Sequence, residues 1–225
     1  MGQNGTQGHQ GPQGPIGTGN QGFQGPQGPG NQGFQGPQGP TGPTGSGTQG
    51  PQGPAGAGAS ASIYQMLMPE EGQYPASSFP QFNIQQGASI TVSELLYDQT
   101  QDEYAFFKRR AVVYGGGNVT CDFDWYSLSG NTTGNVLWGA QIAAITPGDA
   151  QSVETKTFDQ QSTAVGTANG TARGLVRTTV VITHLDSLAN DDDFWLRLGR
   201  IGSSNLDTLV GDAACVMVTI SYARA

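Results

Sequence analysis

Three consecutive carboxylates at Asp191, Asp192 and Asp193 form the densest acidic cluster of the chain. Carboxylate oxygens are favoured ligands of hard cations such as Ca²⁺, so a loop that carries such a cluster is a candidate calcium site. The spacing is not that of an EF-hand loop. A polar loop that leads into a strand explains the same residues, and both interpretations stay open. These three aspartates are the metal-ligand candidates, and we expect no cofactor.

A second set of titratable side chains could serve acid–base chemistry. Asp122 and Asp124 alternate along one segment, and a carboxylate pair on one face is the arrangement of glycoside hydrolases. No partner acid is evident for them, so we interpret them instead as two solvated strand residues. The two histidines, His9 and His184, are far apart in the chain, and we expect His184 to be an ordinary strand residue. No serine lies in a nucleophile-elbow motif, so we expect a protein that is not an enzyme.

The N-terminal and C-terminal parts of the chain have different residue patterns, and these patterns predict different structures. From Gly2 to Gly58, glycine recurs at nearly every third position, and proline often follows it. This period is typical of the collagen triple helix, in which only glycine fits at the axis. A disordered Gly/Pro/Gln-rich linker is the alternative, but it requires no period. We therefore predict a collagen-like stalk over residues 1–58. Its axis glycines include Gly22, Gly25, Gly33 and Gly36.

The triplet pattern loses one residue at four places. The single residues between the glycines there are Thr18, Pro29, Ser46 and Ala57. Each interruption is expected to loosen or re-register a triple helix locally. Hinges and the trace of a tandem duplication are both consistent with their spacing.

Charge is confined to the C-terminal part. The chain has 225 residues and a net charge of −8, and every Lys, Arg, Asp and Glu lies after position 69. The stalk thus lacks ion pairs to align three chains, so we expect a trimerising head. The acidic balance argues against nucleic acid as a partner. We interpret the basic run Lys108-Arg109-Arg110 as a solvated strand edge rather than a ligand patch.

Neither a secretory signal nor a membrane span is evident. Met1 is followed directly by the triplets. No stretch approaches the length of about 18 consecutive apolar residues that a membrane-spanning helix needs. We expect synthesis and assembly in a cytoplasm and no membrane insertion. In that compartment Cys121 and Cys215 are expected to be free and buried.

The C-terminal part reads as short strands separated by turn residues. In 118–127 the apolar residues Val119, Cys121, Phe123 and Trp125 alternate with polar ones, which predicts a half-buried strand. Many such segments indicate a β-sandwich or jelly roll. We expect a neck and connection over 59–87, with Ile63, Met66 and Leu67 around a threefold axis, and a head over 88–225. The expected strands are 87–98, 103–114, 118–127, 134–145, 152–159, 174–185, 193–202 and 211–222.

The strands carry a recurring set of residues, namely Tyr97-Asp98, Glu103, Tyr114 to Gly117, Trp125, Trp138, Asp193 to Arg197, Asp207-Thr208 and Gly211 to Ala213. Through this set, residues 88–223 resemble a C-terminal domain that recurs in bacteriophage structural proteins. The run Lys108-Arg109-Arg110 departs from the apolar strand expected there. The resemblance implies an all-β sandwich head of a virion fibre or decoration.

The combined interpretation is a structural homotrimer on a phage particle. We expect a capsid-surface decoration or head fibre whose head contacts either other virion proteins or a glycan or protein of the host surface, and which end anchors the chain stays open. Arg197 and Tyr126, as exposed partners of Trp195, are candidates for a subunit contact or a glycan site, whereas tryptophans in β-sandwiches are usually core residues. A receptor-binding tail fibre and a spore-surface collagen-like protein are the alternatives.

Overall fold

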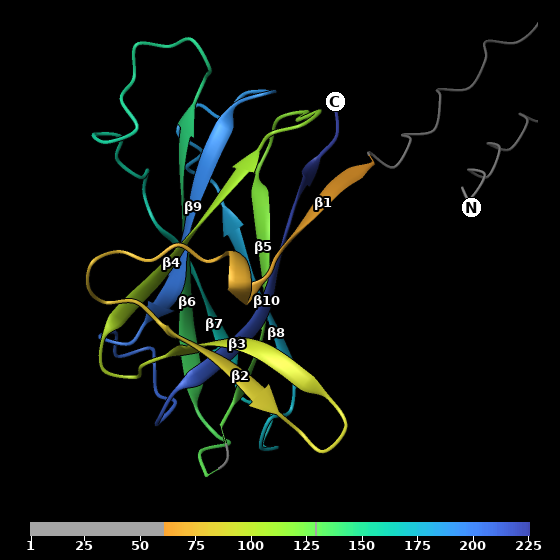
Figure 1. The fold of residues 1–225 in the computed structure, drawn as a ribbon, viewed down its shortest axis with the longest axis vertical. Coiled ribbons are helices and arrows are strands. Elements are labelled where there is room, and N and C mark those ends of the chain that lie inside the picture. Colours follow the sequence, from red (N-terminus) through yellow and green to blue (C-terminus); the bar gives the residue numbers. More distant parts are fainter. Residues whose placement is uncertain (1–60, 129) are drawn as a thin grey trace, which may run out of the picture. The chain divides into compact units, whose positions relative to one another are not determined.

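The computed structural model describes residues 61–128 and 130–225, and residues 60–225 form one compact unit. The triplet region lies outside the described residues, and the predictions made for it stay predictions. These include the axis glycines Gly22, Gly25, Gly33 and Gly36 and the interruptions Thr18, Pro29, Ser46 and Ala57. The described residues form ten strands and one short 3₁₀ helix (Figure 1). The elements are β1 (Ser62–Leu67), η1 (Pro69–Glu71), β2 (Gln81–Gln86), β3 (Thr91–Tyr97), β4 (Asp102–Arg110), β5 (Val119–Ser127), β6 (Asn135–Ile145), β7 (Ser162–Thr167), β8 (Val176–Ile182), β9 (Asp193–Ile201) and β10 (Ala213–Ala223).

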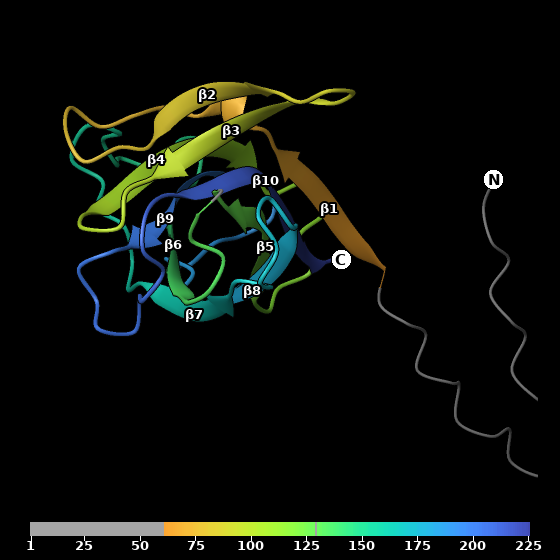
Figure 2. The same ribbon diagram turned by 90° about the horizontal axis from the view of Figure 1, so that it is seen from below.

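Two antiparallel sheets pack face to face. The first has the order β2-β3-β10-β5-β8, and the second has the order β4-β9-β6-β7. Along one edge of β10, β3 pairs with Ala213–Cys215 and β1 pairs with Val218–Ala223. The two layers are visible end-on in Figure 2. The head is thus an all-β sandwich, as the strand pattern predicted.

The alternation of apolar side chains explains the core. Trp138 on β6 is fully buried and lies at its centre, where its ring meets those of Tyr97, Phe123 and Trp125 at centroid distances of 5.3, 4.8 and 5.9 Å. Aromatic pairs at such distances stabilise a core beyond the area they bury. Cys121 is buried in the same core, and both it and Cys215 are free, as predicted.

One expected strand is wrong, and three strands, β1, β2 and β7, were not expected. Residues 152–159 form a turn in which the N–H of Lys156 donates to Ser152 O at 3.0 Å. β7 lies instead at 162–167, where the sequence STAVGT has small residues and a glycine. A short edge strand needs little apolar pattern because it has one neighbour in its sheet. The segment expected at 103–114 also ends early, since β4 stops at Arg110 and Val113 has a φ of +54°.

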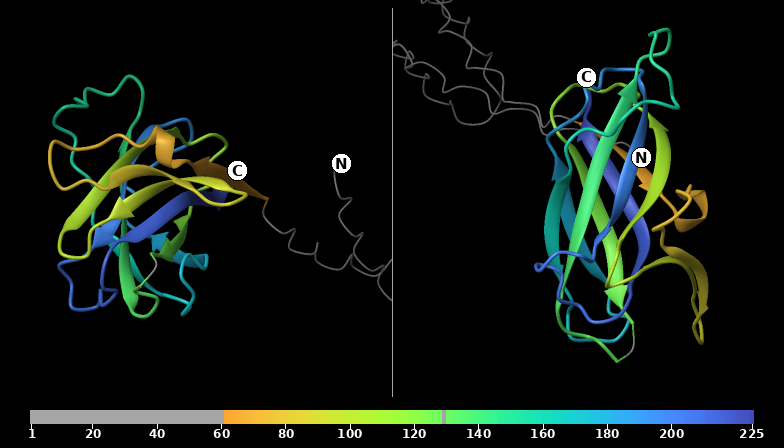
Figure 3. Two further views of the ribbon diagram at one scale, coloured as in Figure 1. Left: turned by 60° about the horizontal axis from the view of Figure 1, so that its bottom comes forward. Right: turned by 90° about the vertical axis from the view of Figure 1, so that its left-hand side faces the viewer.

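Two strands lie in the range predicted as neck and connection. β1 and β2 both belong to the six-stranded sheet. On β1, Leu67 is 1% exposed in the core and Ile63 packs against it, whereas Met66 is exposed. Figure 3 (right) shows this N-terminal part of the head, in orange and yellow, beside the strands of the sandwich.

Candidate functional site

The three candidate metal ligands turn toward different partners. Asp193 Oδ2 lies 2.8 Å from Lys108 Nζ, and Asp191 Oδ1 lies 3.7 Å from an Arg110 nitrogen. Asp192 is buried, and its Oδ2 accepts a hydrogen bond from the N–H of Ala189 at 2.8 Å. In the part of the chain that the structure describes, no group of three His, Cys, Asp or Glu could hold a metal ion. The cluster instead ties the start of β9 to the end of β4.

The carboxylates of β5 are also paired. Arg177 donates two hydrogen bonds of 2.7 Å to Asp124, which is buried, so the expectation of two solvated side chains is wrong for this residue. The hydroxyl of Thr179 donates to Asp122 at 2.5 Å. His184 lies just after β8 rather than within a strand, and the placement of His9 lies outside the described residues.

Each member of the basic run has an acidic neighbour. The pKa of Glu71 is lowered, first because its carboxylate accepts a hydrogen bond from the N–H of Met68 and then because Arg109 lies 2.6 Å away. Lys108 also lies over the ring of Trp195, 5.0 Å from its centroid. The run is therefore part of a strand edge, as expected, and it borders a groove on the outer face of the four-stranded sheet.

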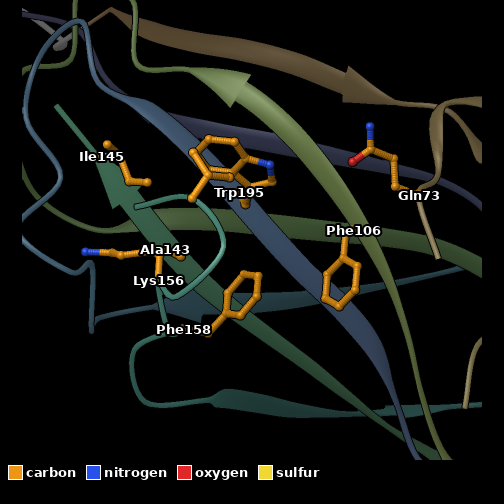
Figure 4. A pocket seen from close by; sticks show the side chains of 8 residues that line it. Gln73, Phe106, Ala143, Ile145, Lys156, Phe158 and Trp195 are labelled. Atoms are coloured by element: carbon orange, nitrogen blue, oxygen red, sulfur yellow. The ribbon is translucent and has the colours of Figure 1, made fainter. Parts of the chain in front are cut away.

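This groove is built from neighbouring strands and one long loop. Register places Phe106 of β4 opposite Arg197 of β9, and Trp195 opposite Ala143 of β6. Because side chains alternate along a strand, these residues share the outer face. The groove has a volume of about 150 Å³ (Figure 4). Its lining residues are Gln73, Phe106, Ala143, Ile145, Val153, Lys156, Phe158 and Trp195.

Aromatic rings form the floor and side of the groove. Phe106 and Phe158 stack with centroids 5.6 Å apart and planes inclined by 11°, although 52 positions separate them in the sequence. Trp195 lies on the same outer face (Figure 4). Farther along that face the guanidinium of Arg197 lies 3.7 Å from the centroid of the Tyr104 ring. Flat apolar surface and polar donors therefore alternate across this side of the head.

Hydrogen bonds hold the loop between β6 and β7 over the sheet. The N–H of Asp159 donates to Ile142 O at 2.9 Å, and the side chain of Gln141 donates to Asp159 O at 2.8 Å. The pKa of Asp159 is lowered because its carboxylate accepts from the N–H groups of Gln160 and Asp186. These contacts fix Phe158 beside Phe106.

Lys156 supplies the charge at the edge of the groove. Its Nζ lies 2.7 Å from Asp186 Oδ2, and the same oxygen accepts from the N–H of Ala144 at 2.7 Å. Gln73 lies across the groove and is held by two backbone hydrogen bonds with Phe106, of 2.9 and 2.7 Å. Lys156 is the titratable side chain among the described lining residues. Such a surface can bind a small ring with an apolar face and polar edges.

The sequence prediction named part of this surface. Trp195 and Arg197 both lie on it, but Tyr126 belongs to the other sheet. There its hydroxyl donates to Glu94, and burial, with help from that carboxylate, raises the pKa of Tyr126 to about 12. Phe158 and Lys156 were not singled out, because the segment that carries them was predicted as a strand.

The residues of the phage-type pattern are structural in this fold. Trp138 and Tyr97 are core residues, and Glu103 accepts a hydrogen bond from the N–H of Asp98 at 2.7 Å. Asp207 is buried beside Arg200, with 2.7 Å between their nearest charged atoms. These members of the pattern stabilise the sandwich, whereas Trp195, which belongs to the Asp193 to Arg197 part of the same pattern, lines the groove.

Comparisons with known proteins assign no family. No family model and no curated protein matches the chain. Solved structures that are similar in fold include a CBM35 from Cellvibrio japonicus Abf62, with 8% identity, 72% of this chain and 99% of that chain covered, and a TM-score of 0.38. The CBM22-1 xylan-binding domain of Paenibacillus barcinonensis Xyn10C has 12% identity, 75% and 99% coverage, and a TM-score of 0.43. The K1 cleaved adhesin domain of Lys-gingipain from Porphyromonas gingivalis has 13% identity, 70% and 97% coverage, and a TM-score of 0.31.

Across residues 61–128 and 130–225, no helix has the length and apolar character that crossing a bilayer requires.

Proposed function

We propose that this chain is a non-enzymatic adhesive fibre protein whose head binds a glycan of a host surface. The observation that carries the proposal is the groove in which the rings of Phe106, Phe158 and Trp195 lie together, with Lys156 and Gln73 at opposite sides of its lining (Figure 4). Sugar rings have apolar C–H faces and polar edges, so they combine well with aromatic surface and nearby donors. A volume of about 150 Å³ suits one ring of a longer chain rather than a large ligand.

The stalk completes the proposed fibre. Glycine at nearly every third position over residues 2–58 supports a three-chain collagen-like rod, which would separate the heads from the particle that carries them. We further propose, from the phage-type pattern of residues 88–223, that this particle is a phage virion and that the chain decorates its surface. Three heads on one rod would bind a multivalent surface with higher avidity than one head.

A glycan panel tests the binding proposal. The full chain, labelled with a fluorophore, is applied to immobilised neutral, N-acetylated and acidic oligosaccharides. We expect retention on a defined subset and a loss of at least tenfold in affinity for Trp195→Ala, while Ile90→Ala binds like the wild type. Ile90 is a matched control because it is 70% exposed and lies in the turn between β2 and β3, away from the groove. Equal retention of both variants, or no retention on any glycan, would contradict the proposal.

A further inference from the structure

The outer face of the six-stranded sheet carries two aligned rows of side chains. Strand β1 sets their direction, because Ile63 and Leu67 turn inward to the core while Tyr64 and Met66 turn outward. The pairing registers of β1, β10, β5 and β8 then continue each row across four strands. The first row is Tyr64, Ser221, Thr120 and Val181, and the second is Met66, Thr219, Asp122 and Thr179.

These rows expose large apolar groups, and the Asp124–Arg177 ion pair lies in the adjoining row of β5 and β8. Tyr64 is 68% exposed, Met66 is 62% exposed and Val181 is 45% exposed. The one charged member, Asp122, accepts a hydrogen bond from the neighbouring Thr179 hydroxyl. Apolar surface of this kind on a soluble protein commonly marks an interaction site. The remaining uncharged members of the two rows are Ser, Thr and Val, whose short side chains suit contact with a large partner.

The position of β1 in the chain indicates that the partner is another copy of the same chain. The last glycine of the triplet pattern is Gly58, and β1 begins at Ser62. Four residues span at most about 14 Å. In a collagen-like rod three chains wind around one axis. Three copies of β1 must therefore start close to that axis, and the first large outward-facing side chains after it are Tyr64 and Met66.

The edge of β1 that does not face β10 already makes hydrogen bonds within the same chain. Figures 1 and 2 show β1 (orange) at the margin of the sandwich, alongside the C-terminal end of β10. The carbonyl of Met66 already accepts a hydrogen bond of 2.8 Å from Arg109, and the Gln65 side chain donates to Arg110 O at 3.2 Å. This edge is therefore partly occupied from within one chain, which leaves the outward side chains of β1 as the free surface.

We infer that the outer face of β1 and β10, centred on Tyr64 and Met66, is the contact between three copies of this chain. The inference rests on the proposed three-chain stalk and adds the surface through which the heads associate. Each copy presents one patch toward the axis, and the closed ring buries Tyr64 and Met66 against the neighbouring copies. This contact holds the three stalk segments at high local concentration, which supplies the alignment that the uncharged triplets lack.

The test compares oligomeric state in three full-length chains. We expect the wild type to sediment as three copies and Tyr64→Lys/Met66→Lys to dissociate to single chains at micromolar concentration. Ile90→Lys is the matched control, because Ile90 has the same exposure but lies in the β2–β3 turn, and it should stay trimeric. Far-ultraviolet circular dichroism checks that the heads remain folded. A trimeric double variant would overturn the inferred surface, and a monomeric wild type would overturn the trimer itself.

Cross-linking gives a second readout that does not depend on destabilising the contact. In Met66→Cys the new thiol should link two copies through a short bis-maleimide, because the inferred contact brings the three copies of residue 66 together. The native Cys121 and Cys215 should not react, because both are buried. Ile90→Cys should give no linked species under the same conditions. A wild-type trimer in which both variants fail to link, or link equally, would place the contact elsewhere and would leave the glycan groove unaffected.

Discussion

Arg200 and Asp207 form a fully buried ion pair with two hydrogen bonds, Nε to Oδ2 at 2.9 Å and an NH2 nitrogen to Oδ1 at 2.7 Å. The remaining donors of Arg200 go to the carbonyls of Tyr97, Gly211 and Leu209. Because Asp207 also accepts from the N–H of Leu137 at 3.0 Å, the pair joins β3, β6, β9 and the loop before β10. A buried pair is stabilising only when such further hydrogen bonds complete it.

Arg200→Met should therefore destabilise the head strongly. Removing one partner leaves a buried charge and three unpaired carbonyls, which costs about 3–5 kcal/mol. The measurement is denaturant unfolding followed by tryptophan fluorescence. Arg110→Met is the control, because its ion pair with Asp191 is more than half exposed on both sides and should contribute about 0–1 kcal/mol. Similar losses in the two variants would refute the account of the pair.

The sequence predicted the parts of the fold that rest on strict alternation. Val119, Cys121, Phe123 and Trp125 are all buried, because one face of β5 must be apolar wherever the sandwich is closed. Asp207 was singled out by resemblance, yet its partner Arg200 was not. A buried arginine cannot be distinguished from a surface one by residue type, since only the tertiary packing places it against its carbonyls.

The groove was predictable in part. Trp195 and Arg197 lie on one strand, and their spacing of two places them on one face. Phe158 comes from a loop, so its stacking on Phe106 depends on hydrogen bonds at Asp159 that leave no periodic signal. Interactions of this kind join segments that are far apart in the sequence, so local residue patterns do not predict them.

Glu103 should give the head a specific pH dependence. Burial raises its pKa, and the nearby carboxylates of Asp98 and Asp212 add to the effect. Above the folded-state pKa the group is charged in both states, so the raised value lowers stability. Below the ordinary pKa it is protonated in both states, and the penalty disappears. Glu103→Gln should therefore raise stability relative to the wild type more at pH 7 than at pH 3.5.

Urea unfolding of both chains at the two pH values measures this difference. The glutamine oxygen can still accept the N–H of Asp98, which lies 2.7 Å from Glu103 Oε2, so the loop geometry is retained. A variant that loses more stability at pH 7 than at pH 3.5 would show that the charged carboxylate stabilises the head.

The cysteines should be unreactive in the folded head. Burial raises the pKa of Cys215 to about 12 and that of Cys121 also rises, for the same reason. Thiolate is the reactive form, so a disulfide reagent should modify neither thiol in buffer and both in guanidinium. Rapid modification of the native protein, at a rate above that of unfolding, would contradict the buried placement.

Gly166 should not tolerate a methyl group. A Cβ there would overlap the hydroxyl of Thr178, which accepts a hydrogen bond of 2.9 Å from the indole N–H of Trp125. Gly166→Ala is expected to cost about 1–3 kcal/mol from overpacking. In Gly166→Ala/Thr178→Ala the overlap is relieved, so the combined cost should be smaller than the sum of the single costs. Additive costs in thermal or urea unfolding would show that the two residues do not meet.

The most direct test of the central claim observes the groove while a sugar binds. The chain has three tryptophans, of which Trp125 and Trp138 are in the core and Trp195 is in the groove. The full chain, labelled with 5-fluorotryptophan, would be titrated with the oligosaccharide retained most strongly, and Trp195→Phe would assign the resonances. We predict a saturable shift of the Trp195 fluorine signal with little change in the other two. Saturable binding that leaves the Trp195 signal unmoved would contradict the proposed site.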